Sequence, residues 1–88
     1  MKTEFTRLFL KDLDKISQKS VKSSVLEIID EVEKLRSLSE ITNIKKLKSY
    51  HTAYRIRTGD YRIGIIVDND VVVFTRLVHR KDIYKVFP

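Results

Sequence analysis

Three arginines alternate with apolar and aromatic side chains in residues 53–66, whose sequence is A-Y-R-I-R-T-G-D-Y-R-I-G-I-I. Neighbouring side chains of a β-strand point to opposite faces, and Gly59 suits a two-residue hairpin turn. Two strands joined by this turn would carry Arg55, Arg57 and Arg62 on one face. Guanidinium groups gathered on one sheet face repel one another unless an anion lies among them. We therefore expect this face to bind phosphate.

The predicted turn also sets the register of the two strands. It places Arg57 opposite Arg62, and Arg55 then lies opposite Gly64. A three-residue turn would instead place Ile56 opposite Arg62 and would mix apolar and basic side chains on both faces, which is disfavoured. The alternative to a phosphate site is that the three arginines face solvent or pair with aspartates, namely Asp60, Asp68 or Asp82.

The 88-residue chain has a net charge of +6 that is unevenly distributed. Residues 1–44 hold eight basic and eight acidic side chains, whereas residues 45–88 hold ten basic and four acidic ones. The whole positive excess therefore lies in the second half, which favours a polyanionic or acidic partner there. A mildly basic surface that only keeps the domain soluble is the alternative.

Cysteine is absent and the two histidines lie far apart, so we expect no disulfide, no metal site and no cofactor. The chain has no apolar run of membrane-spanning length, and its first residues lack the apolar segment of a signal peptide. We therefore expect a single domain over residues 1–88 that acts in the cytoplasm and does not bind membranes.

Two amphipathic helices are predicted ahead of the arginine segment. Thr6 is a favourable N-cap for a helix over about residues 7–16, which follows a short strand over residues 2–6. A longer apolar stripe at helical spacing predicts a second helix over about residues 21–35. Its members are Val21, Val25, Ile28, Ile29, Val32 and Leu35. The two helices are expected to form a hairpin.

The remaining strands complete the predicted fold. A polar loop over 37–43 and a basic segment over 44–49 lead into the arginine hairpin, and the turn at 68–70 leads to a β-branched strand over 71–78. Residues 79–88 leave the sheet and are expected to form one helical turn. The order β-α-α-β-β-β predicts an α+β fold, with two N-terminal helices packed on one face of a small antiparallel sheet. The side chains expected to face the helices are Tyr54, Ile56, Tyr61, Ile63, Ile65 and Val67.

Two motifs at their mutual spacing, R-T-G-D-Y-R at 57–62 and H-R-K-D-I-Y at 79–84, resemble the RelE/ParE superfamily of bacterial type II toxin–antitoxin toxins. The resemblance covers nearly the whole chain and is nearer to the RelE branch. It implies a ribosome-dependent mRNA endonuclease that uses no metal, in which the ribose 2′-hydroxyl attacks the neighbouring phosphorus and the 5′-oxygen leaves. By similarity, the site residues would be Arg55, Arg57, Arg62, Arg80 and Tyr84.

The implied residues suit this chemistry. Fixed guanidinium groups at Arg62 and Arg80 would stabilise the negative charge that grows on the phosphate oxygens. Arg55 and Arg57 would hold the RNA backbone. Arg57 is expected to belong to the catalytic residues together with Arg62, Arg80 and Tyr84. Tyr84 would stack on a base, or orient or deprotonate the attacking hydroxyl.

The general base is left open by the resemblance. RelE itself has lysines at the positions of Arg55 and Arg57, and an arginine hardly ever loses its proton. The proton would then pass to Tyr84, His79 or His51.

Further basic residues are candidates for RNA contact. Lys45, Lys46 and Lys48 form a face that is either simply solvated or contacts ribosomal RNA, and His79 is a weaker candidate. The position of Arg76 depends on the turn at 68–70. A three-residue turn places it on the arginine face opposite Arg62, and a two-residue turn places it on the helix side.

The resemblance also implies partners. These are a cognate antitoxin, mRNA and the ribosome. The alternative function is that of a ParE-like inhibitor of DNA gyrase without nuclease activity, and a decayed, inactive toxin is a third possibility. ParE-type chains usually lack the complete set of basic residues plus tyrosine, which favours the nuclease.

Overall fold

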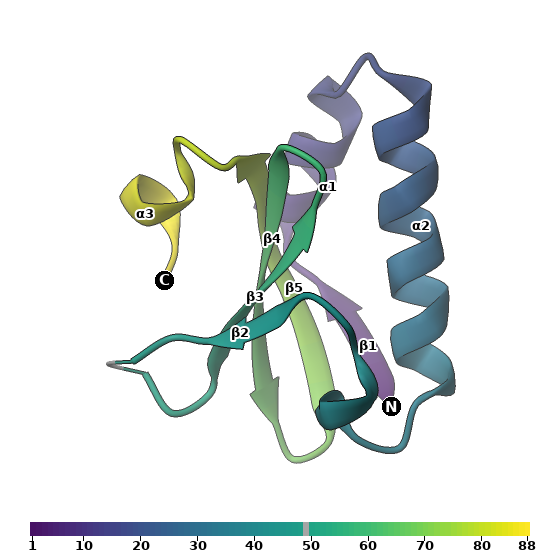
Figure 1. The fold of residues 1–88 in the computed structure, drawn as a ribbon, viewed down its shortest axis with the longest axis vertical. Helices are drawn as coiled ribbons and strands as arrows, with labels where there is room; N and C mark the ends of the chain where they lie inside the picture. Colours follow the sequence, from purple (N-terminus) through teal and green to yellow (C-terminus); the bar gives the residue numbers. More distant parts are fainter. Residues whose placement is uncertain (49) are drawn as a thin grey trace.

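A five-stranded sheet with the strand order β1-β5-β4-β3-β2 forms the centre of the protein (Figure 1). The computed structural model describes residues 1–48 and 50–88. β1 pairs with β5 in parallel and the other three pairs are antiparallel. The strands are β1 (Lys2–Phe5), β2 (Ile44–Lys46), β3 (Ala53–Thr58), β4 (Tyr61–Asp68) and β5 (Val71–His79).

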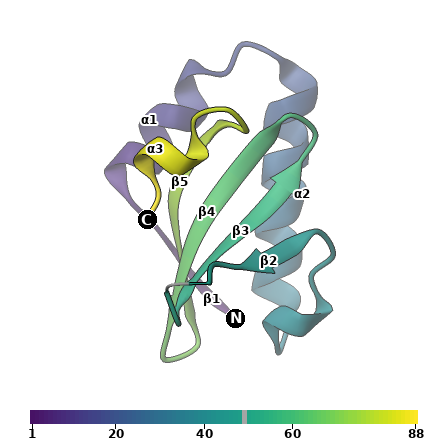
Figure 2. The ribbon, with the colours of Figure 1, turned by 60° about the vertical axis from the view of Figure 1, so that its left-hand side comes forward.

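Two helices cover one face of the sheet and a third, short helix lies on the other face (Figures 1 and 2). As predicted, Thr6 caps the first helix, since its hydroxyl oxygen accepts a hydrogen bond from the N–H of Phe9 at 3.0 Å. No helix in the described part of the chain is both long enough and apolar enough to cross a membrane. The helices are α1 (Arg7–Lys15), α2 (Lys19–Lys34) and α3 (Ile83–Val86), and a 3₁₀ turn, η1, covers Leu38–Glu40.

The predicted α+β fold is confirmed, and the sheet differs from the expected one at both edges. At one edge β1 is parallel to β5, because only strands joined by a tight hairpin are forced to run antiparallel. At the other edge, the segment 44–49 was expected only to be basic, but its first three residues form an additional strand, β2, in which Ile44 pairs with Ile56. The last residue of that segment, Ser49, lies outside the described residues.

The main core lies between the sheet and the two long helices. Ile56, Ile63 and Ile65, all predicted to face the helices, are at most 1% exposed. Phe9 of α1 packs on Phe74 of β5, with ring centroids 5.5 Å apart. Complete burial of such a side chain contributes about 1.5–3 kcal/mol. This core holds the helical hairpin on one face of the sheet and leaves most of the other face for the arginines.

A bulge in β4 and β5 settles the position of Arg76. The turn at Asn69 and Asp70 has two residues, but the pairing shifts between Gly64 and Ile65, so that Gly64 pairs with Arg76. Arg76 therefore lies on the arginine face, as one of the two alternatives had it, but opposite Gly64 and not opposite Arg62, and after a turn of two residues. The reason is that a bulge inserts one residue and reverses the alternation of faces beyond it.

The side chain of Arg76 is held by Asp12 of α1. Its Nε and Nη2 donate to Asp12 Oδ2 and Oδ1 at 2.8 and 3.1 Å, and the N–H of Leu77 donates to Oδ2 at 2.9 Å. β1 pairs with β5 only as far as Phe74, so Asp12 takes the place of a strand partner beyond that point. This contact ties α1 to the edge of the sheet and holds the guanidinium of Arg76 at Asp12, so that Arg76 does not line the cleft of the other arginines.

Candidate functional site

The β3–β4 hairpin carries the three arginines in the predicted register. Arg57 pairs with Arg62, and Arg55 pairs with Gly64, as the two-residue turn required. β2 adds Lys45 directly opposite Arg55. The three arginines and Lys45 line a cleft of about 300 Å³. This set of side chains is called the arginine cleft below.

Helix α3 docks on the same sheet face through a second, small core. Ala53 of β3, Ile83 of α3 and Phe87 are each at most 4% exposed and pack together. The ring of Phe87 lies over Gly64, where a Cβ atom would come within 2.5 Å of the ring. Because Gly64 has no side chain, the ring of Phe87 fits against the sheet at this position and anchors the end of the chain.

Tyr84 projects from α3 beside the arginine cleft. Its side chain is 71% exposed, and Arg55 both donates a hydrogen bond to its hydroxyl and lies with its guanidinium carbon 4.8 Å from the ring centroid. The hydrogen bond from Arg55 lowers the pKa of Tyr84, and the positive charges of Arg55, Lys45 and Arg62 lower it further. The phenol is thus easier to deprotonate than a free tyrosine.

Arg62 lies at the centre of the positive charge. Burial lowers the pKa of Arg62, and the nearby charges of Arg57, Arg55 and Arg80 add to this effect. Its Nη1 donates to the carbonyl oxygens of Gly59 and Tyr61 at 3.0 and 2.9 Å, which holds the guanidinium near the turn. A group whose charged state is disfavoured by its neighbours gains most from a bound anion.

Arg80 follows the end of β5 and lies beside the hairpin turn. Its backbone N–H donates to the carbonyl oxygen of Asp60 at 2.7 Å, which fixes the chain beside the hairpin turn. Arg57, Arg62 and Arg80 also line a second hollow of about 610 Å³ that extends to α2. The two motifs that were singled out in the sequence therefore meet in space.

The arginines of the cleft have no carboxylate partner within ion-pair distance among residues 1–48 and 50–88. The ion pairs found there join Lys34 to Asp30, Arg76 to Asp12, and Lys85 to Asp82. The alternative in which the three hairpin arginines pair with Asp60, Asp68 or Asp82 is therefore not observed. Their charge is left for an external anion.

Asn43, which the sequence did not single out, orients Arg57. Its Oδ1 accepts a hydrogen bond from Arg57 Nη2 at 3.3 Å, and its carbonyl oxygen accepts from the N–H of Arg57 at 3.0 Å. Its φ of 62° lies in the left-handed region, which asparagine tolerates better than most residues. The sequence signal was only an asparagine in a polar loop, which is too common to be informative.

The three lysines lie near Tyr84. Lys45, Lys46 and Lys48 line a hollow of about 260 Å³ together with Arg55 and Tyr84. The arginine cleft is thus extended by a basic shelf along β2 and the residues after it.

The histidines are not brought into the arginine cleft. His79 pairs with Tyr61, contacts that ring edge-on at a centroid distance of 5.8 Å, and lines a hollow on the helix side with Gln18 and Val21. His51 is exposed in the turn before β3. Among the three residues proposed from the sequence as a base, only Tyr84 lies at the cleft.

The cleft combines several cationic side chains with the neighbouring phenol of Tyr84, whose pKa is lowered. Such a site can hold a phosphodiester, stabilise added negative charge on its oxygens and accept a proton. In the described part of the chain, no three His, Cys, Asp or Glu side chains are grouped so that they could hold a metal ion.

Comparison with known proteins identifies related chains. Residues 3–84 match the family model of the ParE toxin of the type II toxin–antitoxin system parDE. The toxin RelE3 of Methanocaldococcus jannaschii is 44% identical over 89 residues, and the match covers 100% of both chains.

Solved structures of RelE chains have the same fold as this protein. A RelB–RelE antitoxin–toxin complex from Methanococcus jannaschii contains a chain with a TM-score of 0.83 and 42% identity, covering 97% of this chain and 99% of that one. An archaeal RelE–RelB complex from Pyrococcus horikoshii has a TM-score of 0.74 and 25% identity, covering 90% and 93%. The E. coli RelBE complex, at 21% identity and a TM-score of 0.70, shares the fold.

Proposed function

The chain belongs to the RelE/ParE superfamily of type II toxin–antitoxin toxins, nearer the RelE branch, and from this premise we propose that it cleaves mRNA on the ribosome. One observation carries the proposal. Arg55, Arg57, Arg62 and Arg80 gather without carboxylate partners among the described residues, and Arg55 holds the hydroxyl of Tyr84 beside them. The substrate would be a phosphodiester of mRNA in the cytoplasm, where ribosomes work.

The proposed reaction is a transesterification within the RNA. The ribose 2′-oxygen forms a bond to the adjacent phosphorus and its proton passes to a base, while the bond from phosphorus to the 5′-oxygen breaks. The 5′-oxygen takes a proton from water and the base later returns its proton to water, so that the products are a 2′,3′-cyclic phosphate and a 5′-hydroxyl. Arg62 and Arg80 stabilise the charge that builds on the non-bridging oxygens. Arg57, oriented by Asn43, holds the backbone of the strand.

Tyr84 is the proposed base. A general base works best when its pKa lies near the operating pH, and Arg55, Lys45 and Arg62 all lower the pKa of this phenol. Arginine at positions 55 and 57 fits this division of roles. The guanidiniums supply fixed charge and the phenol takes the proton.

An antitoxin is the proposed protein partner. The two archaeal relatives were solved as complexes of RelE with RelB. A partner that covers the arginine cleft would neutralise charge that this domain leaves unpaired.

A cell-free translation system tests the nuclease. Wild-type protein should cut mRNA within codons on stalled ribosomes. Arg62→Ala and Arg80→Ala should each lower the cleavage rate by about 10²–10³, as expected for the loss of one transition-state donor. Arg36→Ala, which removes an equal charge from an exposed site that lines neither the cleft nor the second hollow, should leave the rate unchanged. Intact mRNA with the wild-type protein would refute the proposal.

A second candidate function comes from the family model. The match carries the ParE name, so inhibition of DNA gyrase is the alternative. In a supercoiling assay with purified gyrase, the nuclease proposal expects no inhibition. Inhibition together with intact mRNA would favour the ParE-like function.

A further inference from the structure

The second hollow joins the arginine cleft to helix α2. Its volume of about 610 Å³ lies within the range of small-ligand sites. Asn43, Arg57 and Arg62 line both spaces, so the hollow and the cleft adjoin. An RNA strand whose scissile phosphate lies among the cleft arginines therefore has a neighbouring nucleotide within reach of the hollow.

The two walls of the second hollow carry opposite charges. Arg57, Arg62 and Arg80 line it from the sheet side, whereas Glu27 and Glu31 line it from α2, one helical turn apart. Both glutamates are exposed, and neither takes part in an ion pair among residues 1–48 and 50–88. The carboxylates therefore share the hollow with the guanidiniums without pairing with them.

A nucleotide has the same division of charge. Its phosphate is an anion that binds guanidinium groups, and the edges of cytosine, adenine and guanine carry amino groups that donate to carboxylate oxygens. The glutamates would repel a phosphate, so the strand would lie with its backbone on the sheet side and a base toward α2. An arginine guanidinium can stack on the face of such a base, and the half-buried side chain of Ile28 adds an apolar contact within the hollow.

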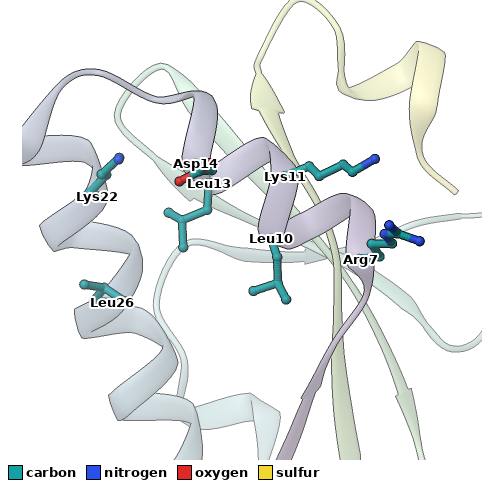
Figure 3. Close-up of a pocket in the computed structure, with 7 residues that line it drawn as sticks. All are labelled: Arg7, Leu10, Lys11, Leu13, Asp14, Lys22 and Leu26. Carbon is teal, nitrogen blue, oxygen red and sulfur yellow. The ribbon is translucent and has the colours of Figure 1, made fainter.

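The groove between α1 and α2 has a different lining (Figure 3). Leu10, Leu13 and Leu26 make part of it apolar, and Asp14 is the one carboxylate among the residues that line it. None of the residues drawn in Figure 3 lines the arginine cleft or the second hollow. Asp14 is therefore a suitable control position for the carboxylates of the second hollow.

We propose that the second hollow binds a nucleotide next to the scissile phosphate, and that Glu27 and Glu31 select a base with an exocyclic amino group. Such a group donates hydrogen bonds to the carboxylates. Uracil has a carbonyl oxygen where cytosine has its amino group, and a carboxylate repels that oxygen. The inference rests on the proposed nuclease function and adds what determines the site at which the mRNA is cut.

Cleavage of matched mRNAs tests the site. In the cell-free system, each base of the codon at which the ribosome stalls is changed from cytosine to uracil, one position at a time. At a position next to the cut, the wild-type protein should cleave the cytosine mRNA about tenfold faster than the uracil mRNA. Glu27→Ala and Glu31→Ala should each remove most of this preference, and Asp14→Ala should keep it.

The ratio of the two cleavage rates is the decisive quantity. Removal of a negative charge near RNA strengthens the binding of every sequence, so this effect would raise both rates together and leave their ratio unchanged. All three variants should keep the wild-type melting temperature, since the replaced side chains are exposed. A lower ratio at unchanged stability is not expected if the glutamates only support the fold.

Two outcomes in the cleavage assay would overturn the proposal. The first is equal rates for cytosine and uracil at every position. The second is a preference that both glutamate variants keep, because the ribosome or another part of the toxin would then select the base.

A binding measurement separates failure of this site from failure of the nuclease. If the wild-type protein cuts no mRNA, the proposed nuclease function is refuted, and 2′-O-methyl trinucleotides that contain either cytosine or uracil still probe the hollow. Tighter binding of the cytosine trinucleotide that is lost in Glu27→Ala and Glu31→Ala would retain the base site. Equal Kd values of the wild-type protein for the two trinucleotides would overturn it.

Discussion

Gly64 of β4 lies directly against the ring of Phe87, and a methyl group at Gly64 would come within 2.5 Å of Cγ of that ring. The contact joins the middle of the sheet to the end of the chain. Because Phe87 anchors α3, this packing also determines where Tyr84 meets Arg55. A residue without a side chain thus helps to build the candidate site.

Gly64→Ala should displace Phe87, lower the cleavage rate and cost about 1–3 kcal/mol of unfolding free energy through overpacking. In a Phe87→Ala background the added methyl has room, so the same change should cost much less. Urea unfolding of the two single variants and the double variant measures this coupling, which we expect to exceed about 0.5 kcal/mol. Additive costs would show that the ring does not occupy this space.

Asn43→Gly should lower kcat/KM for cleavage by roughly tenfold, as the loss of one orienting hydrogen bond would. Glycine keeps the positive φ of 62° but cannot accept the hydrogen bond from Arg57. Asn69→Gly is the matched control, since Asn69 has a φ of 49° in the distant β4–β5 turn. Equal rates for the two variants would exclude a role for Asn43 in orienting Arg57.

The cleavage rate should rise with pH as Tyr84 loses its proton, over a range that lies below the ordinary tyrosine pKa of 10.0. Arg55→Met removes the hydrogen bond and the charge that lower this pKa, so the rising limb should move to higher pH. The midpoint pH of the rising limb is compared, and not the maximal rate, because Arg55 is also proposed to hold RNA. Tyr84→Phe should remove the limb, and a limb that stays in this variant would assign it to another group.

Absorbance titration checks the same pKa without RNA. The protein has four tyrosines, so the signal of Tyr84 is the wild-type curve minus that of Tyr84→Phe. A lowered folded-state pKa means that the group adds stability above the unfolded value of about 10 and loses it as the pH falls through the folded value. Exposure of the side chain keeps this contribution small.

Asp12→Ala should cost about 3 kcal/mol of unfolding free energy, because it leaves the guanidinium of Arg76 and the N–H of Leu77 without their acceptor. Asp14→Ala removes an exposed carboxylate two residues away and should change the value by less than about 0.5 kcal/mol. Chemical denaturation measures both. Similar values for the two variants would show that Asp12 does not hold α1 to the sheet.

Local rules were sufficient for the hairpin that carries Arg55, Arg57 and Arg62. The turn at Gly59 and the alternation of side chains act over a few residues, so the register could be predicted and is confirmed. The same applies to the N-cap at Thr6 and to the apolar stripe of α2. The family motifs identified Arg80 and Tyr84, but not the contacts that position them.

Such local rules do not predict the position of Arg76. Its face depends on a bulge between Gly64 and Ile65, and neither residue marks a bulge unambiguously in the sequence. The pairing of β1 with β5 and the position of His79 on the helix side likewise depend on the arrangement of distant segments.

The sequence by itself determined the fold class, the shared face of three arginines and the family, because each depends on short-range periodicity or on motif spacing. Only the tertiary structure decided that Phe87 anchors α3 on Gly64, that Asn43 orients Arg57, and that Tyr84 rather than His79 lies at the cleft. These contacts join residues remote in the chain. Their free energies come from packing and hydrogen bonds that exist only once the elements have assembled.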